Sequence, residues 1–186
     1  MTNAANEVTR GTAFDVQDAV PMYALVMAAV RPLVLIVDDH AINRKLLGAA
    51  VRKLGFTTLE AEDGAQALAL CAGQRDHNIA CVLLDLQMPV LDGWSTARQM
   101  RSGACSLPDD VPIIACTGCD LQEQSQQATG QSIEEHTLSC GVNLCLNKPL
   151  SLARLTAALE QLAVPCPAAG SAVPLCTSPV TKVACC

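Results

Sequence analysis

Aromatic residues are scarce in this chain. Two phenylalanines, one tyrosine and one tryptophan account for 2% of its 186 residues. A hydrophobic core must therefore be built from aliphatic residues and cysteine, and hydrophobic residues make up 51% of the sequence. This length is sufficient for one domain of ordinary size with additional segments at its ends.

Clustered basic residues and long hydrophobic runs are also missing. Twelve lysines and arginines stand against 18 acidic residues, which gives a net charge of −6. Nucleic acids and anionic membrane surfaces are bound through clustered basic side chains, so the composition argues against both partners and favours another protein. The apolar stretch 21–30 is too short for a membrane span and lacks the flanks of a signal peptide.

Cysteine, by contrast, occurs 11 times. The odd number, the scattered positions and the missing secretory signal argue against a disulfide framework. We interpret most of these residues as small buried hydrophobes in a reducing, cytoplasmic compartment. Cys116 and Cys119 form a C-x-x-C pair, and Cys140 and Cys145 follow later. A zinc or redox site there remains an alternative, although the later pair has the wrong spacing for zinc.

Short apolar runs alternate with amphipathic segments between residues 33 and 162. The expected strands are Leu33–Val37, Phe56–Ala61, Ile79–Leu84, Val111–Cys116 and Val142–Leu146. Helices are expected over 41–54, 64–71, 93–100 and 152–162, with Ser151 capping the last one. This order predicts an α/β fold, a doubly wound parallel sheet of five strands with helices on both faces. We expect residues 1–31 to form a flexible arm with a short helix at 20–30, 32–163 to form the domain, and 164–186 to be a disordered Pro/Ala/Cys-rich tail.

Chemically distinctive residues stand at the ends of four of these strands. Asp38 and Asp39 follow the first strand, Asp85 the third, Thr117 the fourth and Lys148 the fifth. Ligands of such sheets bind beyond the carboxyl ends of the strands, so these side chains are expected to share one pocket.

The residue types suit a magnesium ion and a phosphoryl group. Converging carboxylates repel one another, and Mg²⁺ with its preference for oxygen ligands relieves the repulsion. We expect Asp39 and Asp85 to bind the ion directly, Asp38 directly or through water, and the backbone carbonyl of Gln87 to add an oxygen. Asp85 is the candidate nucleophile toward phosphorus. Lys148 and Thr117 would neutralise and hydrogen-bond the phosphoryl oxygens.

The motifs as a set resemble those of response-regulator receiver domains of two-component phosphorelays. The matching stretches are LVLIVDDHAINRKLL, EAEDGAQAL, CVLLDLQMPVLDGW, VPIIACTG and CLNKPL. The resemblance implies the strand order 2-1-3-4-5. It also places the acidic pair on Asp38 and Asp39, the phosphoacceptor on Asp85, the hydroxyl switch residue on Thr117 and the phosphate-binding lysine on Lys148. The start Asp-Asp-His-x-x-Asn is most similar to receivers of hybrid histidine kinases.

The resemblance also implies a function as a phosphoacceptor switch rather than an enzyme. A histidine kinase or histidine phosphotransfer protein would donate the phosphoryl group, Mg²⁺ would be the cofactor, and output would run through protein contact. The chain departs from the family at Cys145, where a tyrosine or phenylalanine often partners the hydroxyl switch. It departs again in a long polar segment, residues 121–136, which we interpret as a solvated loop or a partner-specific surface.

Two other functions remain open. A pseudo-receiver would keep the fold as an interaction scaffold without accepting phosphate. A small haloacid-type phosphatase also uses a strand-end aspartate, but its D-x-D-x-T motif is absent after Asp85. We expect His40, His77 and His136 to lie at the surface, and Trp94 to have a packing role.

Overall fold

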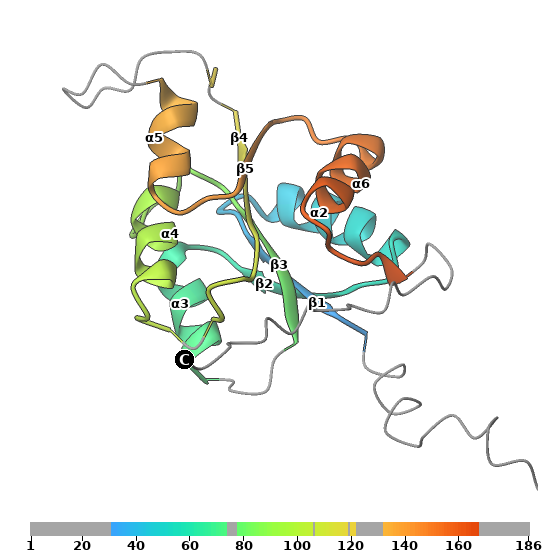
Figure 1. Cartoon of the computed structure of the whole chain (residues 1–186), viewed down its shortest axis with the longest axis horizontal. Coiled ribbons are helices and arrows are strands. Elements are labelled where there is room, and N and C mark those ends of the chain that lie inside the picture. The colour runs from blue at the N-terminus through green and yellow to red at the C-terminus, as the bar shows by residue number, and fades with distance from the viewer. Residues whose placement is uncertain (1–30, 74–77, 106, 119, 122–131, 168–186) are drawn as a thin grey trace, which may run out of the picture. The chain divides into compact units, whose positions relative to one another are not determined.

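The five expected strands form a single parallel sheet. The computed structural model describes residues 31–73, 78–105, 107–118, 120–121 and 132–167 (Figure 1). The strands lie in the order β2-β1-β3-β4-β5, which confirms the predicted fold class and strand order. Their bounds are β1 Leu33–Val37, β2 Thr57–Ala61, β3 Ile79–Leu84, β4 Ile113–Thr117 and β5 Leu144–Asn147. All neighbouring strands pair in parallel.

Within the residues that the structure describes, five helices cover the two faces of the sheet. They are α2 Ala41–Lys53, α3 Gly64–Gly73, α4 Gly93–Arg101, α5 Ile133–Ser139 and α6 Leu152–Gln161. Helices α3, α4 and α5 lie on one face, and α2 and α6 lie on the other (Figure 1). Among the described residues, none of these helices has the length and apolar content that crossing a membrane requires.

The core consists of two hydrophobic clusters, one on each face of the sheet. Alternate residues of β1 contribute to both, since Leu35 and Val37 face the α3–α5 layer while Val34 and Ile36 face α2 and α6. All four side chains are at most 1% exposed. Burial on both faces explains why this strand is continuously apolar in the sequence.

Short polar side chains cap the N-termini of α4, α5 and α6. Ser151 accepts a hydrogen bond from the amide of Arg154, as predicted for the start of α6. Asp92 caps α4 through the amide of Ser95, and Ser132 forms a capping box with Glu135 at the start of α5. Each cap satisfies amides that have no partner within the helix.

Three of the expected strands start too early in the prediction, β2 by one residue and β4 and β5 by two. Val111 and Val142 are buried, at 8% and 5% exposure, but both precede the paired residues of their strands. Apolar side chains of a loop that packs on the core give the same sequence signal as a strand.

The interpretation of residues 121–136 as a solvated loop is wrong for its last part. Residues 133–136 belong to helix α5, whereas 122–131 lie outside the described residues. The prediction of a surface position is also wrong for His136, which is 7% exposed. Its ring lies 6.0 Å from the ring of Trp94, so α5 buries it against α4. His40 is exposed as predicted, and His77 lies outside the described residues.

Part of the apolar stripe of α2 lies outside the core. Leu47 and Val51 are buried, but Ile42 is 73% exposed and Leu46 is 66% exposed. Helical periodicity identifies an apolar stripe, but it does not show how much of that stripe the neighbouring layer covers.

Candidate functional site

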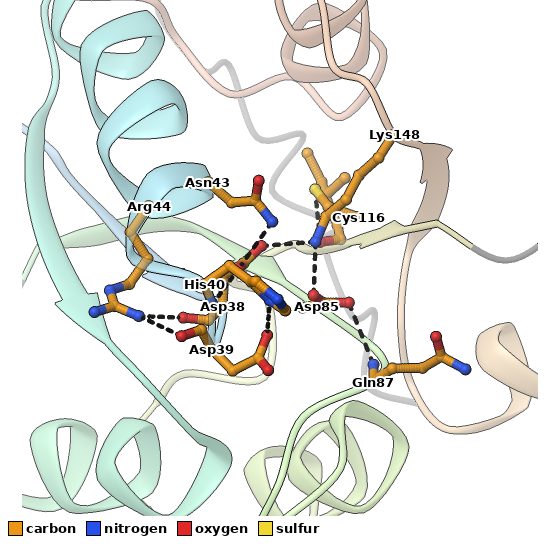
Figure 2. A network of polar contacts seen from close by, with 10 residues as sticks. Asp38, Asp39, His40, Asn43, Arg44, Asp85, Gln87, Cys116 and Lys148 are labelled. Atoms are coloured by element: carbon orange, nitrogen blue, oxygen red, sulfur yellow. Dashed lines mark hydrogen bonds and ion pairs between the residues drawn. The ribbon is translucent and has the colours of Figure 1, made fainter.

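The carboxyl ends of the strands gather most of the predicted site residues. Asp38 directly follows β1, Asp85 follows β3, and Lys148 follows β5, while Thr117 is the last residue of β4. Because the strands are parallel, these positions share one edge of the sheet. Figure 2 shows Asp38, Asp85 and Lys148 pointing toward one another.

Lys148 joins two of the carboxylates. Its Nζ lies 2.7 Å from Oδ2 of Asp38 and 2.6 Å from Oδ2 of Asp85. The two aspartates are only 1% and 6% exposed. Burial by itself lowers the pKa of Lys148, but the hydrogen bonds and charges of Asp38 and Asp85 outweigh it and leave that pKa raised. The lysine is therefore held charged where two buried carboxylates meet.

The first turn of α2 orients Asp38. Oδ1 of this residue accepts hydrogen bonds from the His40 amide at 2.9 Å and from Nδ2 of Asn43 at 3.2 Å. Arg44 donates to the backbone carbonyls of Asp38 at 2.7 Å and Asp39 at 3.1 Å. In the sequence, Asn43 and Arg44 stand out only as part of the motif that follows the acidic pair. Their spacing from the acidic pair, within one turn of the following helix, is the signal that assigns them this supporting role.

Asp39 turns toward a different neighbour. Its Oδ1 lies 2.6 Å from Nδ1 of His40, whose side chain is 72% exposed. Among the described residues, Asp38, Asp39 and His40 form the group whose side-chain ligand atoms are close enough to share a metal ion. Asp85 is outside that group, so its link to the acidic pair runs through Lys148. Asp39 thus faces His40 while Asp85 faces Lys148, and a metal site shared by the three carboxylates stays a prediction.

Thr117 and Gln87 complete the predicted set. Thr117 is fully buried, and its carbonyl accepts a hydrogen bond from the Lys148 amide at 2.7 Å. The Gln87 amide donates to Oδ1 of Asp85 at 3.2 Å. The predicted roles of the Thr117 hydroxyl and of the Gln87 carbonyl remain predictions.

The donor set fits a magnesium ion. Asp38 and Asp85 share Lys148, and Asp39 lies beside them at the end of β1. These three carboxylates exceed the charges of Lys148 and Arg44, and a divalent cation would balance the excess. Carboxylate oxygens are the ligands that Mg²⁺ prefers. Asp39 is partly exposed, so a rotation away from His40 would free its oxygens for an ion.

The described cysteines are free thiols, and six of them are buried: Cys71, Cys81, Cys105, Cys116, Cys140 and Cys145. None of them belongs to the candidate metal group found among the described residues. For these six, the structure confirms the interpretation as small buried hydrophobes. Cys119, the second residue of the C-x-x-C pair, lies outside the described residues.

Comparison with known proteins identifies the family of the domain. The family model for the response regulator receiver domain matches residues 34–160. The chain is 37% identical over 129 residues to sensor protein EvgS of Escherichia coli K12. This alignment covers 69% of this chain and 9% of EvgS. The chain is 34% identical over 129 residues to response regulator MprA of a Mycobacterium species, covering 69% of this chain and 49% of that protein.

Solved structures are similar as well. The receiver domain of sensor histidine kinase PA1611 from Pseudomonas aeruginosa is 29% identical with a TM-score of 0.57, covers 72% of this chain and 98% of its own, and has a magnesium ion coordinated in its active site cleft. Chemotaxis protein CheY4 of Vibrio cholerae, at 22% identity and a TM-score of 0.57 over 72% of this chain and 99% of its own, shows the shared fold. This chain belongs to the response regulator receiver domains, the switches of two-component phosphorelay signalling.

Proposed function

We propose that this chain accepts a phosphoryl group on Asp85 in a Mg²⁺-dependent reaction and signals through protein contact. The observation that carries the proposal is the Lys148 ammonium shared by Asp38 and Asp85. A buried carboxylate beside a fixed cation, at the edge of the sheet where ligands bind, suits an acyl phosphate product.

Each residue has a defined part in the transfer. A carboxylate oxygen of Asp85 attacks the phosphorus of a phosphohistidine, and the P–N bond breaks as the new P–O bond forms. The imidazole nitrogen leaves with the electron pair and takes a proton from solvent. Lys148 neutralises charge on the transferred group, and the Thr117 hydroxyl donates to one of its oxygens. Asp38, Asp39, Asp85 and the Gln87 carbonyl would hold Mg²⁺, which supplies further charge neutralisation when bound.

The exposed face of α2 supports a protein as the phosphodonor. Ile42 and Leu46 are large apolar side chains in solvent, and Lys45 beside them is exposed. A cavity of about 350 Å³ between α2 and the segment around Leu150 continues this apolar surface to Lys148. A histidine kinase or histidine phosphotransfer protein that covers this face would bring its histidine to Asp85. The free thiols suit a reducing, cytoplasmic setting for this exchange.

The matched relatives are much longer than this chain in several cases. The aligned segment is 9% of EvgS and 11% of the sensor histidine kinase RcsC of Escherichia coli K12. In such proteins the receiver is one part of a larger kinase. The phosphodonor of this chain is therefore proposed only by chemical class, as a histidine kinase or a histidine phosphotransfer protein.

A second candidate function rests on Cys145. This residue occupies the position where the family often has an aromatic partner for the hydroxyl switch, and its side chain is small and 8% exposed. A pseudo-receiver that binds partners without accepting phosphate has no need of that aromatic residue. Such a scaffold would not, however, require the partly exposed Lys148 to be held between two buried carboxylates.

One experiment separates the two functions. The chain is incubated with Mg²⁺ and a small acyl phosphate, and its intact mass and Trp94 fluorescence are followed. We expect one phosphoryl adduct in the wild type and in Asp109→Asn, an exposed aspartate of a loop, but none in Asp85→Asn. An unmodified wild type that also shows no response to beryllofluoride would exclude the switch and leave the scaffold.

A further inference from the structure

Helix α4 begins directly on the backbone of the phosphoacceptor segment. The Gly93 amide donates to the carbonyl of Leu86 at 2.9 Å. A methyl group added at Gly93 would lie 2.2 Å from the carbonyl oxygen of Asp85 and 2.7 Å from the Cα atom of Leu86. Since nothing separates these backbones, a shift of Asp85 and Leu86 must be passed to the first residue of α4.

The first turn of α4 is tied together by its cap. Oδ1 of Asp92 accepts from the Ser95 amide at 2.7 Å, and the Thr96 hydroxyl donates to the Asp92 carbonyl at 2.7 Å. Thr96 is completely buried. These bonds hold residues 92–96 as one unit, so Trp94 follows any movement of Gly93.

Trp94 connects that unit to α5. Its indole Nε1 donates to the hydroxyl of Thr137 at 2.8 Å, and its ring lies at 46° to the ring of His136. The Thr137 hydroxyl in turn donates to the carbonyl of Ile133 at 2.6 Å and is completely buried. The acceptor of the indole is therefore fixed in position on α5, and the bond joins two helices directly.

Among the described residues, the α3–α5 face of the sheet offers few other side chains that could pass a change at Asp85 to a helix. Cys145 of β5 is small, and Phe56, the other Phe, Tyr or Trp side chain among the described residues, packs in the cluster on the opposite face. Trp94 thus provides the single large ring of the described α3–α5 layer. Its side chain links the first turn of α4, which begins on the Asp85 segment, to α5.

We propose that Trp94 transmits the phosphorylation state of Asp85 to helix α5 through its hydrogen bond to Thr137. This inference rests on the proposed phosphoacceptor function and adds the route by which the signal reaches a surface helix. Trp94 acts here as a positioning residue, since it touches neither the phosphoryl group nor a metal. The route gives α5, with its partly exposed Leu138, a state-dependent position for contact with a partner.

The test compares amide hydrogen exchange of residues 133–139 with and without Mg²⁺ and beryllofluoride. Trp94→Phe keeps an aromatic ring at this position but removes the indole N–H donor. Thr137→Val removes the hydroxyl acceptor at nearly equal volume. Thr137→Ser keeps the hydroxyl and serves as the matched control. Beryllofluoride binding is measured separately by fluorine NMR, and exchange in α6 serves as the internal reference.

We expect beryllofluoride to change exchange in α5 by about fivefold or more in the wild type and in Thr137→Ser. The change falls below about twofold in Trp94→Phe and in Thr137→Val, although both still bind beryllofluoride. The double variant loses no more than either single variant, because both remove the same bond.

The outcomes distinguish this inference from the proposed function. A wild type that binds no beryllofluoride overturns both. Binding that leaves α5 unchanged in the wild type, or an α5 response that survives in both single variants, overturns the role of Trp94 alone.

Discussion

Lys148 and Asp85 form a close ion pair between two strand ends, with Nζ 2.6 Å from Oδ2. The aspartate is nearly inaccessible to water, and the lysine side chain is 22% exposed. Removing one partner from such a pair leaves the other charge buried without compensation. Folding, metal binding and phosphorylation of this chain are therefore expected to depend on one another at this site.

Replacing Lys148 with methionine is expected to make folding depend on Mg²⁺. Asp38 and Asp85 lose their shared cation, so the metal-free variant is destabilised by roughly 3 kcal/mol. Mg²⁺ then stabilises the variant more than it stabilises the wild type, because ligand binding to the folded state adds to its stability. Urea unfolding with and without Mg²⁺ measures both effects, and Lys53→Met at the exposed end of α2 is the control. Loss of Mg²⁺ affinity in the Lys148 variant would contradict the assigned roles.

Replacing Leu46 with aspartate is expected to impair phosphotransfer from a protein donor. Leu46 is exposed in the free chain, so the change leaves stability nearly untouched. In a complex it would bury a charge against an apolar surface, and kcat/KM is expected to fall by about tenfold, or about 1.4 kcal/mol. Phosphorylation by a small acyl phosphate, which needs no docking, is expected to be unchanged. Leu138→Asp on α5 is the matched control, and an equal loss in both variants would exclude α2 as the docking face.

A methyl group at Gly93 is expected to disturb the site more than one at Gly73. The first would overlap the Asp85 carbonyl, whereas nothing lies within 4 Å of the second. We expect Gly93→Ala to cost about 1–3 kcal/mol of stability, because the backbone itself must shift, and to weaken Mg²⁺ binding. Gly73→Ala is expected to be neutral. Thermal unfolding and Mg²⁺ titration followed by Trp94 fluorescence provide the comparison, and equal stabilities would refute the close contact.

Replacing Val90 with asparagine is expected to stabilise the chain. Val90 has a φ of 69°, a left-handed conformation that is unfavourable for a β-branched residue, and it is 82% exposed. Asparagine tolerates this conformation, and little packing is lost, so the gain is about 1 kcal/mol. Val90→Ile keeps the branched side chain and is expected to give no gain. Chemical denaturation of the three proteins decides the point.

The buried cysteines are expected to resist alkylation in the native state. Burial raises the pKa of Cys116 to about 12 and that of Cys145 to about 11, so the reactive thiolate is scarce near neutral pH. Cys166 is more exposed, although burial followed by the charge of Glu160 also raises its pKa. Among the described thiols, Cys166 is expected to react first with iodoacetamide at pH 8, as peptide mass spectrometry would show. Rapid labelling of Cys116 would contradict its burial.

The sequence predicted the strands and helices well wherever local pattern and burial agree. The runs at 33–37 and 79–84 are apolar without interruption because both faces of these strands are covered. Helix ends were predicted where capping chemistry is local, as at Ser151. The prediction for His136 was wrong because its polar neighbours in the sequence gave no sign that α5 packs it against Trp94.

The candidate site was likewise predicted only in part. Strand-end positions predicted that Asp38, Asp85 and Lys148 meet, because parallel strands bring their carboxyl ends to one edge. The position of a residue at a strand end did not show which side chain it would contact. Asp39 faces His40 rather than Lys148, and Arg44 holds the backbone carbonyls of the acidic pair.

The order of apolar and polar residues alone thus determined the α/β fold and the edge of the sheet where the acidic residues and the lysine gather. Only the tertiary structure decided which carboxylates share the ammonium, how much of α2 stays exposed, and that Trp94 bonds to Thr137. Periodicity depends on residues that are close in the sequence, so it can be recognised without the tertiary structure. Side-chain pairing and exposure depend on how separate elements pack, and those distances are fixed only when the whole domain is assembled.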